Sequence, residues 1–442
     1  MRIAERVFQL KAHKTKVSTE FLAGMTIFMT TAFIIAVNPE ILAVTGMDRG
    51  GLFTATIIAT IVPTLLMAFL AKYPFAVAPG MGMNAYFAFV VARELGWELA
   101  LIALFFQGIA FVILASVKFR EKILESIPYN LKLAFGVGIG VFITLIGFQG
   151  GGFIVDNPDT MLGLGELTSP TTLLFLAGCV ITAILLANKI RGGIFLGIII
   201  TYLLGLICQL LGIYVGPSLI PQGIIAAPPS IADVSIFAAF RGADWVGVDI
   251  FRFITIFIAF FIVDVLDTVG TLIGVSEKAG FLDKNGKLPR ARQAFLADAI
   301  GTVAGAAAGT STTTTYIESA AGIAEGGRTG LTALFVAIFF AACLFFWPVF
   351  SVIPTFATAP ALVMVGFYMM GIVVKIDFRT FAEGFPAFLT IILIPFTYSV
   401  SNGLVFGILS YVILKLFTGR AKEISVIMYV LSAFFILKLI IT

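Results

Sequence analysis

Long apolar runs, separated by short polar connections, make up nearly the whole chain. A helix that crosses the hydrocarbon core of a membrane needs about 20 mainly apolar residues. The sequence offers fourteen such runs, some of them short, and a fifteenth at its end. We expect spans at residues 18–44, 52–70, 75–91, 97–117, 131–149, 170–188, 193–213, 250–275, 293–308, 310–325, 330–348, 357–374, 384–398 and 402–418, and a last run at 425–441 that is either a further span or an interfacial helix. The pattern predicts an all-α polytopic membrane protein.

The third run is interrupted by residues that break a helix. It reads FAVAPGMGMNAYFAF from Phe75 to Phe89. Pro79 removes a backbone donor, and Gly82 permits close approach or unusual dihedral angles. We expect a new helix to open at Asn84. Glycine-rich packing between helices is the alternative interpretation.

The tenth run is interrupted by threonines. Residues 309–327 read GTSTTTTYIESAAGIAEGG, and β-branched residues in succession lower the preference for helix. We expect extended backbone at 310–315 and a short helix at 316–325. Irregular backbone at membrane depth is tolerated only where protein or a water-filled cavity covers it, and in secondary transporters such breaks surround the substrate. The sequence thus predicts two short extended segments, in the broken third and tenth spans, at a buried site.

The two halves of the chain resemble each other weakly. MTIF at 25–28 recurs as ITIF at 254–257, which aligns Asn38 with Asp267. Each half then has seven spans, and an odd number forces the second copy to insert upside down. This arrangement is the 7+7 transmembrane inverted repeat of many transporters.

Basic residues concentrate in every second connection, and Lys and Arg favour the cytoplasmic side of a membrane. The connections expected inside hold Arg2, Arg6, Lys11, Lys14, Lys16, Lys118, Arg120, Lys122, Lys189, Arg191, Lys278, Lys284, Lys287, Arg290 and Arg292. Those expected outside hold only Arg49, Arg93, Arg241 and Arg252, and the outside loop at 150–169 has acids and no base. The alternation predicts a multi-pass protein of the cell membrane, the inner membrane in a bacterium, with a cytoplasmic N-terminus.

Composition narrows the class of protein further. Hydrophobic residues make up 60% of the chain and charged residues 12%, against roughly 45–50% apolar content in soluble domains. We therefore expect the lipid bilayer as the surroundings. The net charge of +4 fits connections held against an anionic leaflet and gives no reason to expect nucleic acid. The three cysteines fall inside apolar runs, where cysteine acts as a small hydrophobe, and no metal or other cofactor is expected.

Acidic residues inside the apolar runs are the candidate functional groups, because ionisable groups in spanning segments are costly. Asp264 and Asp267 lie three residues apart, on one helix face, and two like charges in a low dielectric do not both ionise readily. With Glu318 they are predicted to converge on a cavity near the midplane and to carry a proton. Alternatively, one aspartate caps a broken helix or bonds to a neighbouring span. We expect a structural hydrogen bond at Asp298 and solvation at Glu40.

Several motifs together resemble one known family. APGMGMNAYF, DVLDTVGTLIGVSEKAGF and TTTTYIESAAGIAEGGRTG are similar to the xanthine/uracil permeases, which are nucleobase-cation symporters, and within them to the adenine, guanine and hypoxanthine branch. The resemblance implies a core domain of spans 1–4 and 8–11 (residues 18–117 and 250–348) that moves against a gate domain of spans 5–7 and 12–14 (residues 118–213 and 357–418). The N-terminal arm (1–17) and the C-terminal segment (425–441) lie outside both.

The resemblance also implies site residues. Asp267 matches the carboxylate of the eighth span in this family, Glu318 that of the tenth, Tyr316 the aromatic residue before it, and Asn84 a polar position of the third span. Some relatives have a histidine where this chain has Thr271. Since the single histidine of the chain lies in the N-terminal arm, any proton relay must rest on carboxylates.

Together with the resemblance, these residues predict a secondary active transporter, not an enzyme, that takes up purine nucleobases (hypoxanthine, guanine and/or adenine) by proton symport. Asp264, Asp267 and Glu318 would accept N–H bonds from the base, and Asn84 would both donate and accept. Backbone near Gly82 and Thr315 would add N–H groups, and Tyr316 or Phe261 would lie against the ring.

Other functions remain open at this point. Sodium could replace the proton as the coupling ion, and an anion transporter or a channel could share the fold, although three acids and no base at the site argue against an anion. An intramembrane aspartyl protease would carry a Gly-x-Gly-Asp motif, which the sequence lacks. A homodimer is a further alternative for the assembly.

Overall fold

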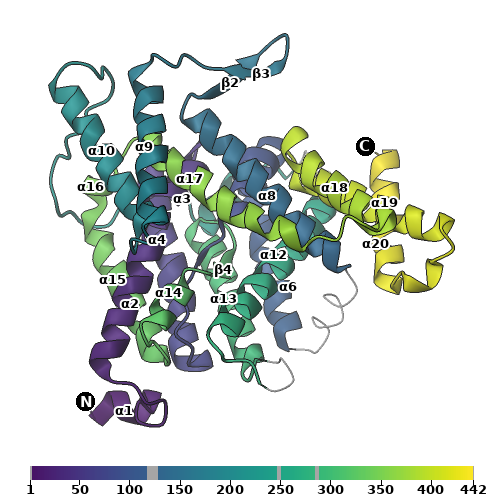
Figure 1. The fold of residues 1–442 in the computed structure, drawn as a ribbon, viewed down its shortest axis with the longest axis horizontal. Coiled ribbons are helices and arrows are strands. Elements are labelled where there is room, and N and C mark those ends of the chain that lie inside the picture. Colours follow the sequence, from purple (N-terminus) through teal and green to yellow (C-terminus); the bar gives the residue numbers. More distant parts are fainter. Residues whose placement is uncertain (1, 117–127, 246–249, 284–287, 442) are drawn as a thin grey trace.

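Helices account for most of the chain, as the apolar runs predict. The computed structural model describes residues 2–116, 128–245, 250–283 and 288–441 (Figure 1). Five basic residues that the sequence assigns to inside connections lie outside the described residues: Lys118, Arg120, Lys122, Lys284 and Lys287.

Most of the helices form two groups by their packing, and each group draws on both halves of the chain. The first group contains α2 (Val17–Thr31), α3 (Ile34–Ala43), α4 (Arg49–Leu66), α5 (Met81–Tyr86), α6 (Ala92–Ser116), α12 (Ile250–Lys278), α13 (Ala291–Ala308), α14 (Ser319–Ala324) and α15 (Gly330–Cys343). The second group contains α8 (Tyr129–Gly150), α9 (Pro170–Ala187), α10 (Gly193–Leu210), α17 (Thr355–Met370), α18 (Phe381–Phe396) and α19 (Val400–Phe417). Thus α13 packs against α4 and α6, and α17 packs against α8, α9 and α10.

The remaining elements connect or flank these groups. They are α1 (Arg2–Phe8), α11 (Ile236–Gly242), α16 (Trp347–Phe350), α20 (Val426–Ile441), the π-helical η1 (Met67–Ala71) and η2 (Phe87–Val91), and the 3₁₀ segments η3 (Leu344–Phe346), η4 (Gly371–Lys375) and η5 (Ala421–Glu423). Two short β-ladders complete the fold, β1 (Val77–Pro79) with β4 (Thr313–Thr315) and β2 (Ile154–Asn157) with β3 (Met161–Leu164).

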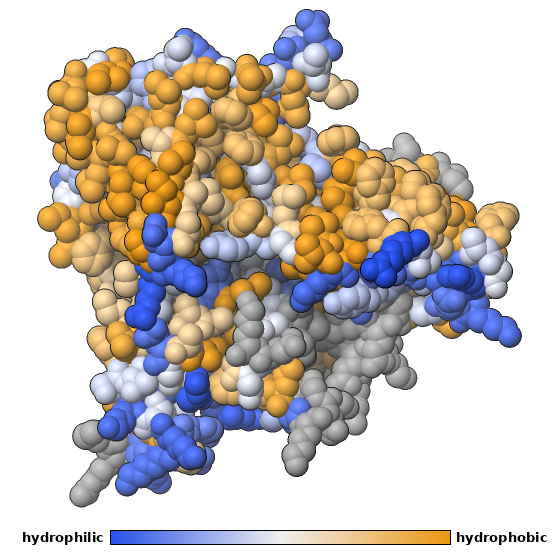
Figure 2. Space-filling model, in the orientation of Figure 1, coloured by the Kyte–Doolittle hydropathy of each residue, from blue (hydrophilic) through white to orange (hydrophobic). Residues whose placement is uncertain are grey.

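The predicted spans coincide with these helices. In the described part of the chain, eight helical stretches are long and apolar enough to cross a membrane, and shorter apolar helices cover 256–265, 381–396, 402–417 and 426–436. Figure 2 shows a broad hydrophobic surface over α9 and α10, between the hydrophilic β2–β3 hairpin at one end of the molecule and the hydrophilic N-terminal arm at the other. Side chains on these helices, such as Val180 and Ile207, are exposed. Such a surface suits contact with lipid.

The first predicted span, 18–44, is divided in two. α2 ends at Thr31, and α3 begins at Ile34. The hydroxyls of Thr30 and Thr31 both donate to the Ile27 carbonyl at 2.8 Å, and such bonds to the preceding turn bend helices. The break leaves Phe33 buried at the turn, where it meets the tenth span.

Two features lie in connections for which the sequence predicted no regular structure. The hairpin β2–β3 occupies the acidic loop between α8 and α9, and α11 lies between α10 and α12. Ser235 caps α11 by accepting a hydrogen bond from the Ala238 amide, which is a common way to begin a helix.

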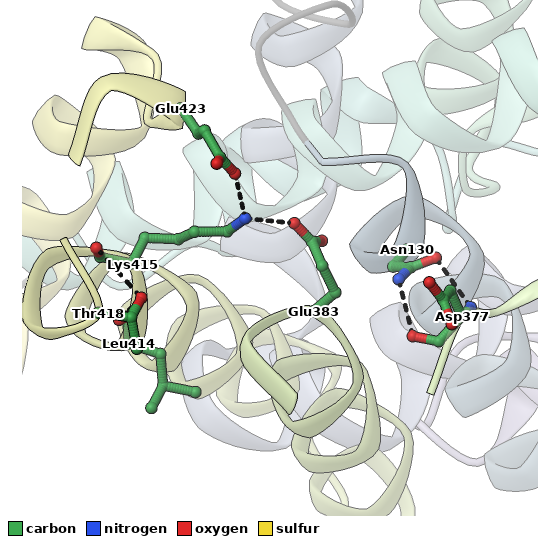
Figure 3. Close-up of polar contacts among 7 residues, drawn as sticks. All are labelled: Asn130, Asp377, Glu383, Leu414, Lys415, Thr418 and Glu423. Carbon is green, nitrogen blue, oxygen red and sulfur yellow. Dashed lines mark hydrogen bonds and ion pairs between the residues drawn. The ribbon is translucent and has the colours of Figure 1, made fainter. Parts of the chain in front are cut away.

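A buried lysine ties the second group to the C-terminal segment (Figure 3). Lys415 of α19 is almost fully buried, and its Nζ pairs with Glu383 of α18 at 2.7 Å and with Glu423 of η5. A buried charge is tolerated when it is paired. The hydrogen bond from Lys415 holds the pKa of the exposed Glu423 carboxyl below its usual value. These contacts fix the start of α20.

Candidate functional site

The broken third and tenth spans meet in a short antiparallel ladder, which confirms the two predicted extended segments. Val77 lies opposite Thr315, Ala78 opposite Thr314 and Pro79 opposite Thr313. Two further backbone bonds extend the ladder, from Gly80 N to Thr312 O at 2.9 Å and from Tyr316 N to Ala76 O at 3.0 Å. The two halves of the chain are therefore joined at the points where their helices break.

Side chains of neighbouring helices satisfy the backbone groups of this buried ladder. The Thr64 hydroxyl of α4 lies 3.0 Å from both the Val77 amide and the Val77 carbonyl oxygen. The Thr302 hydroxyl of α13 accepts from the Thr313 amide at 3.2 Å, and the Ser319 hydroxyl accepts from the Ala76 amide at 3.0 Å. Unpaired backbone groups are costly at membrane depth, so these hydroxyls make the irregular backbone tolerable.

Asp267 of α12 faces the ladder. A Cβ atom added at Gly80 would lie 3.4 Å from Asp267 Oδ2, so the carboxylate approaches the turn between β1 and α5. Thr314 of β4 lies beside Asp267, and the hydroxyls of Thr271 and Thr314 lie 3.1 Å apart. A carboxylate of the eighth span and a hydroxyl of the tenth are thus neighbours.

Glu318 lies at the other end of β4, directly before α14. It is partly exposed, and it lies within electrostatic range of Tyr316 and of Tyr368 on α17. Because Tyr316 is also within electrostatic range of Asp267, both carboxylates lie in the neighbourhood of this tyrosine. Glu318 therefore lies where the ladder approaches the second helix group.

Tyr316 is held in a fixed position. Its hydroxyl donates to the Pro79 carbonyl at 2.6 Å, and its ring stacks on Phe33, with ring centroids 6.3 Å apart and planes inclined by 26°. The side chain is buried. With its hydroxyl hydrogen engaged, Tyr316 can offer a ligand its ring and the acceptor capacity of its oxygen, but no donor.

Asn84 joins the two broken spans. It is fully buried in α5, and its Oδ1 accepts a hydrogen bond from the Ser311 hydroxyl just before β4. The only partner described for its Nδ2 group is the Met81 sulfur at 4.0 Å, which is a weak acceptor. An amide in this state retains donor capacity for a ligand.

Gly82 and Thr315 have other roles in the structure than the predicted backbone donors. A Cβ at Gly82 would lie 2.6 Å from Ile139 Cγ2, so this glycine permits α5 of the first group to approach α8 of the second. Thr315 is the end of the ladder, opposite Val77, and its buried hydroxyl has no partner among the described residues. Substrate contact by either residue stays a prediction.

Asp264 meets a different neighbour from Asp267. It is fully buried, and its Oδ2 accepts from Gln107 Nε2 of α6 at 2.8 Å. This contact corresponds to the alternative in which one aspartate bonds to a neighbouring span, and a coupling role for Asp264 stays a prediction. Phe261 packs edge-on against Phe111 of α6, with centroids 6.3 Å apart, and no contact with Tyr316 is described for it.

Asp298 and Glu40, the other acidic residues whose roles the sequence predicted, are both hydrogen-bonded. Asp298 Oδ2 accepts from the Thr268 hydroxyl at 2.6 Å, as the predicted structural role requires. The expectation that Glu40 is solvated is wrong: Glu40 pairs with Arg49 at 2.8 Å and accepts from the Thr355 hydroxyl at the start of α17. The pair lines a cavity of about 510 Å³ between the two helix groups.

Sequence reasoning missed three residues that build the site. Gln107 had a signal, since it is an amide within the apolar run 97–117. Ser311 lay inside the threonine stretch, but only the fold reveals its contact with Asn84. Phe33 had no signal, because one aromatic residue in an apolar run does not differ from the rest.

Comparison with known proteins agrees with this geometry. The sequence model of the xanthine/uracil permeases, described as a permease family, matches residues 18–406. The chain belongs to the xanthine/uracil permease family. Within this permease family, it is 42% identical to the guanine/hypoxanthine permease PbuO of Bacillus subtilis, over 98% of this chain and 100% of the relative. It is 37% identical to the adenine permease AdeP of Escherichia coli, over 99% of this chain and 96% of the relative.

A solved structure supports the fold of this permease. The transmembrane domain of the cyanobacterial bicarbonate transporter BicA superposes with a TM-score of 0.63 at 15% identity, covering 87% of this chain and 97% of the domain. At this identity the likeness shows the fold alone, a 7+7 inverted repeat. The chain is thus a multi-pass membrane transport protein and not an enzyme.

Proposed function

We propose that this permease takes up the purine bases hypoxanthine, guanine and/or adenine by proton symport. One observation carries the proposal: Asp267 and Glu318 both lie near the fixed Tyr316 side chain, at the point where two broken spans meet. The names of the relatives, an adenine permease and a guanine/hypoxanthine permease, support the same substrate class.

The proposed binding mode follows from the donors and acceptors of a planar base. Carboxylates at Asp267 and Glu318 would accept bonds from ring N–H groups or an exocyclic amine, Asn84 Nδ2 would donate, and the Tyr316 ring would lie against the base. Xanthine and uracil carry an extra carbonyl, which facing a carboxylate would leave acceptors unpaired at a cost of about 1–3 kcal/mol.

The proposed transport cycle moves the two helix groups against each other. The first group would be the core (18–117 and 250–348), which carries the site, and the second the gate (118–213 and 357–418). In secondary transporters, alternating access is largely a rigid-body motion of one repeat or bundle around a fixed site. The Glu40–Arg49 pair of the first group would lie at the boundary with the gate. Arg49 also donates to the Ser351 and Ile353 carbonyls just before α17, at 3.2 and 2.8 Å.

Competition for uptake tests the substrate class. In cells that lack their own purine permeases, unlabelled adenine or guanine should inhibit uptake of labelled hypoxanthine at concentrations about 5- to 150-fold lower than xanthine or uracil, which is the ratio that 1–3 kcal/mol predicts. Stronger inhibition by xanthine or uracil would overturn the assignment. A proton uncoupler should abolish accumulation, whereas dependence on a sodium gradient would favour the sodium-coupled alternative, and competition by bicarbonate would favour the anion transporter.

Orientation is part of the proposal: the N-terminal arm is cytoplasmic, and the β2–β3 hairpin lies outside the cell membrane. The alternation of basic residues supports it. With Cys179, Cys208 and Cys343 replaced, a cysteine introduced at Asp159 in the hairpin connection should react with an impermeant thiol reagent in intact cells, and one at Lys189 only after permeabilisation. Both sites are exposed, so labelling of both from outside would refute the orientation.

A further inference from the structure

A groove of about 1180 Å³ lies between the N-terminal arm and the first helix group. Its rim carries Arg6, Lys11 and Lys16, and its wall contains Phe21 of α2 and Phe335 of α15. In Figures 1 and 2 the arm forms the hydrophilic end of the molecule, below α2 and α15. Basic and apolar walls thus meet in one open groove.

The arm is packed against the helices. Phe8 of α1 is buried and lies 5.7 Å from Phe69 of η1 between ring centroids, and Leu10 is buried with Leu331 of α15 in the same hydrophobic cluster. The groove is therefore a fixed part of the fold.

The polar wall has an excess of positive charge. Arg6, Lys11 and Lys16 are all exposed, and the one acid that lines the groove, Glu5, accepts from the Lys11 amide at 3.3 Å. Three basic side chains suit a phosphate group.

The apolar wall continues into the surface that faces lipid. Phe21 is 44% exposed and packs edge-on against Phe335, with centroids 5.2 Å apart. Leu22 and Met25, further along α2, are 47% and 42% exposed. A ligand that filled the groove would therefore need an acidic head and a long apolar body.

We propose that the groove binds an anionic phospholipid, with its phosphate between Arg6, Lys11 and Lys16 and an acyl chain along Phe21 and Phe335. The cytoplasmic leaflet supplies such lipids, so the proposal rests on the orientation given above and not on the transported substrate. The bound lipid would attach the arm to the membrane beside the core.

The test is lipid binding to the purified full chain in detergent, measured by native mass spectrometry during titration with phosphatidylglycerol or phosphatidylcholine. The wild-type chain should retain phosphatidylglycerol at lower concentration than phosphatidylcholine. The variant Arg6→Gln/Lys11→Gln/Lys16→Gln should bind phosphatidylglycerol at least tenfold more weakly, since each basic residue near an anionic lipid surface contributes about fivefold. All three basic side chains are exposed, so their replacement should leave the packing of Phe8 and Leu10 intact and the arm should still fold.

The matched control is Arg379→Gln/Arg420→Gln/Lys422→Gln, which removes the same charge from exposed positions near α18 and α20. It should change phosphatidylglycerol affinity less than twofold. An equal loss of phosphatidylglycerol affinity in both variants, or no loss in either, would overturn the proposal that the lipid binds in this groove. Displacement of the lipid by glycerol phosphate at similar concentration would show that an anion alone is recognised and would overturn the lipid assignment. Because the readout is binding, failure of this proposal and failure of purine transport are distinguishable.

Discussion

Asp267→Asn and Glu318→Gln should each prevent the permease from concentrating purines. Both substitutions keep the shape of the side chain and remove its titratable group. If the carboxylates bind the base and carry the proton, each variant loses a charged hydrogen bond worth about 1.5–3 kcal/mol, so initial uptake should fall about 10- to 150-fold. Proteoliposomes with an imposed pH gradient and labelled hypoxanthine provide the measurement. Equilibration without accumulation in either variant would identify that carboxylate as the coupling group.

Asp298→Asn is the matched control, because Asp298 is also a carboxylate of the first helix group but is fully buried and bonded to Thr268. Its uptake should keep the wild-type dependence on pH. Asp264→Asn then decides between the two interpretations of Asp264: a coupling carboxylate would lose accumulation, and a structural partner of Gln107 would lose only stability. Accumulation with unchanged pH dependence in both Asp267→Asn and Glu318→Gln would contradict the coupling role.

The extended segments of the site could be predicted because their signals are local. Pro79 and the threonines at 312–315 disfavour helix through their own backbone and side-chain chemistry, and the structure has strands at 77–79 and 313–315. That the two segments pair, and in which register, is not local. Their pairing depends on the inverted packing of the halves, which brings residues more than two hundred positions apart into contact.

The partner of each acidic residue could not be predicted for the same reason. Helix periodicity places Asp264 and Asp267 on one face, but a face of α12 meets several elements. Asp264 accepts a hydrogen bond from Gln107 of α6, whereas Asp267 lies beside Thr314 of β4. Glu40 likewise lay near a predicted helix end, where solvation is the ordinary expectation, and its partners Arg49 and Thr355 come from helices of different groups. Sequence thus identified the chemistry, and tertiary packing assigned the partners.

Gly82→Ala should impair transport by obstructing the contact between the two helix groups. The added Cβ would lie 2.6 Å from Ile139 Cγ2, a distance that forces α5 and α8 apart or displaces the buried Ile139 side chain. Overpacking of this kind costs about 1–3 kcal/mol, more than the gain of up to about 1 kcal/mol from replacing glycine by alanine in a helix. If α5 belongs to the core and α8 to the gate, we expect uptake to fall about tenfold while the protein still folds.

A second substitution at the contact distinguishes packing from the predicted backbone donation by Gly82. Ile139→Ala removes the atoms that would clash, so the double variant Gly82→Ala/Ile139→Ala should recover uptake relative to Gly82→Ala, which a lost ligand contact would not allow. Gly136→Ala is the matched control on α8, because a Cβ there would meet only Ile372 Cδ1, at 4.0 Å. It should leave uptake within about twofold of wild type, since an ordinary van der Waals contact carries no overpacking cost. Full uptake by Gly82→Ala would contradict motion of α5 against α8. A double variant that takes up no more substrate than Gly82→Ala would also contradict it, and would favour close approach of the ligand at Gly82.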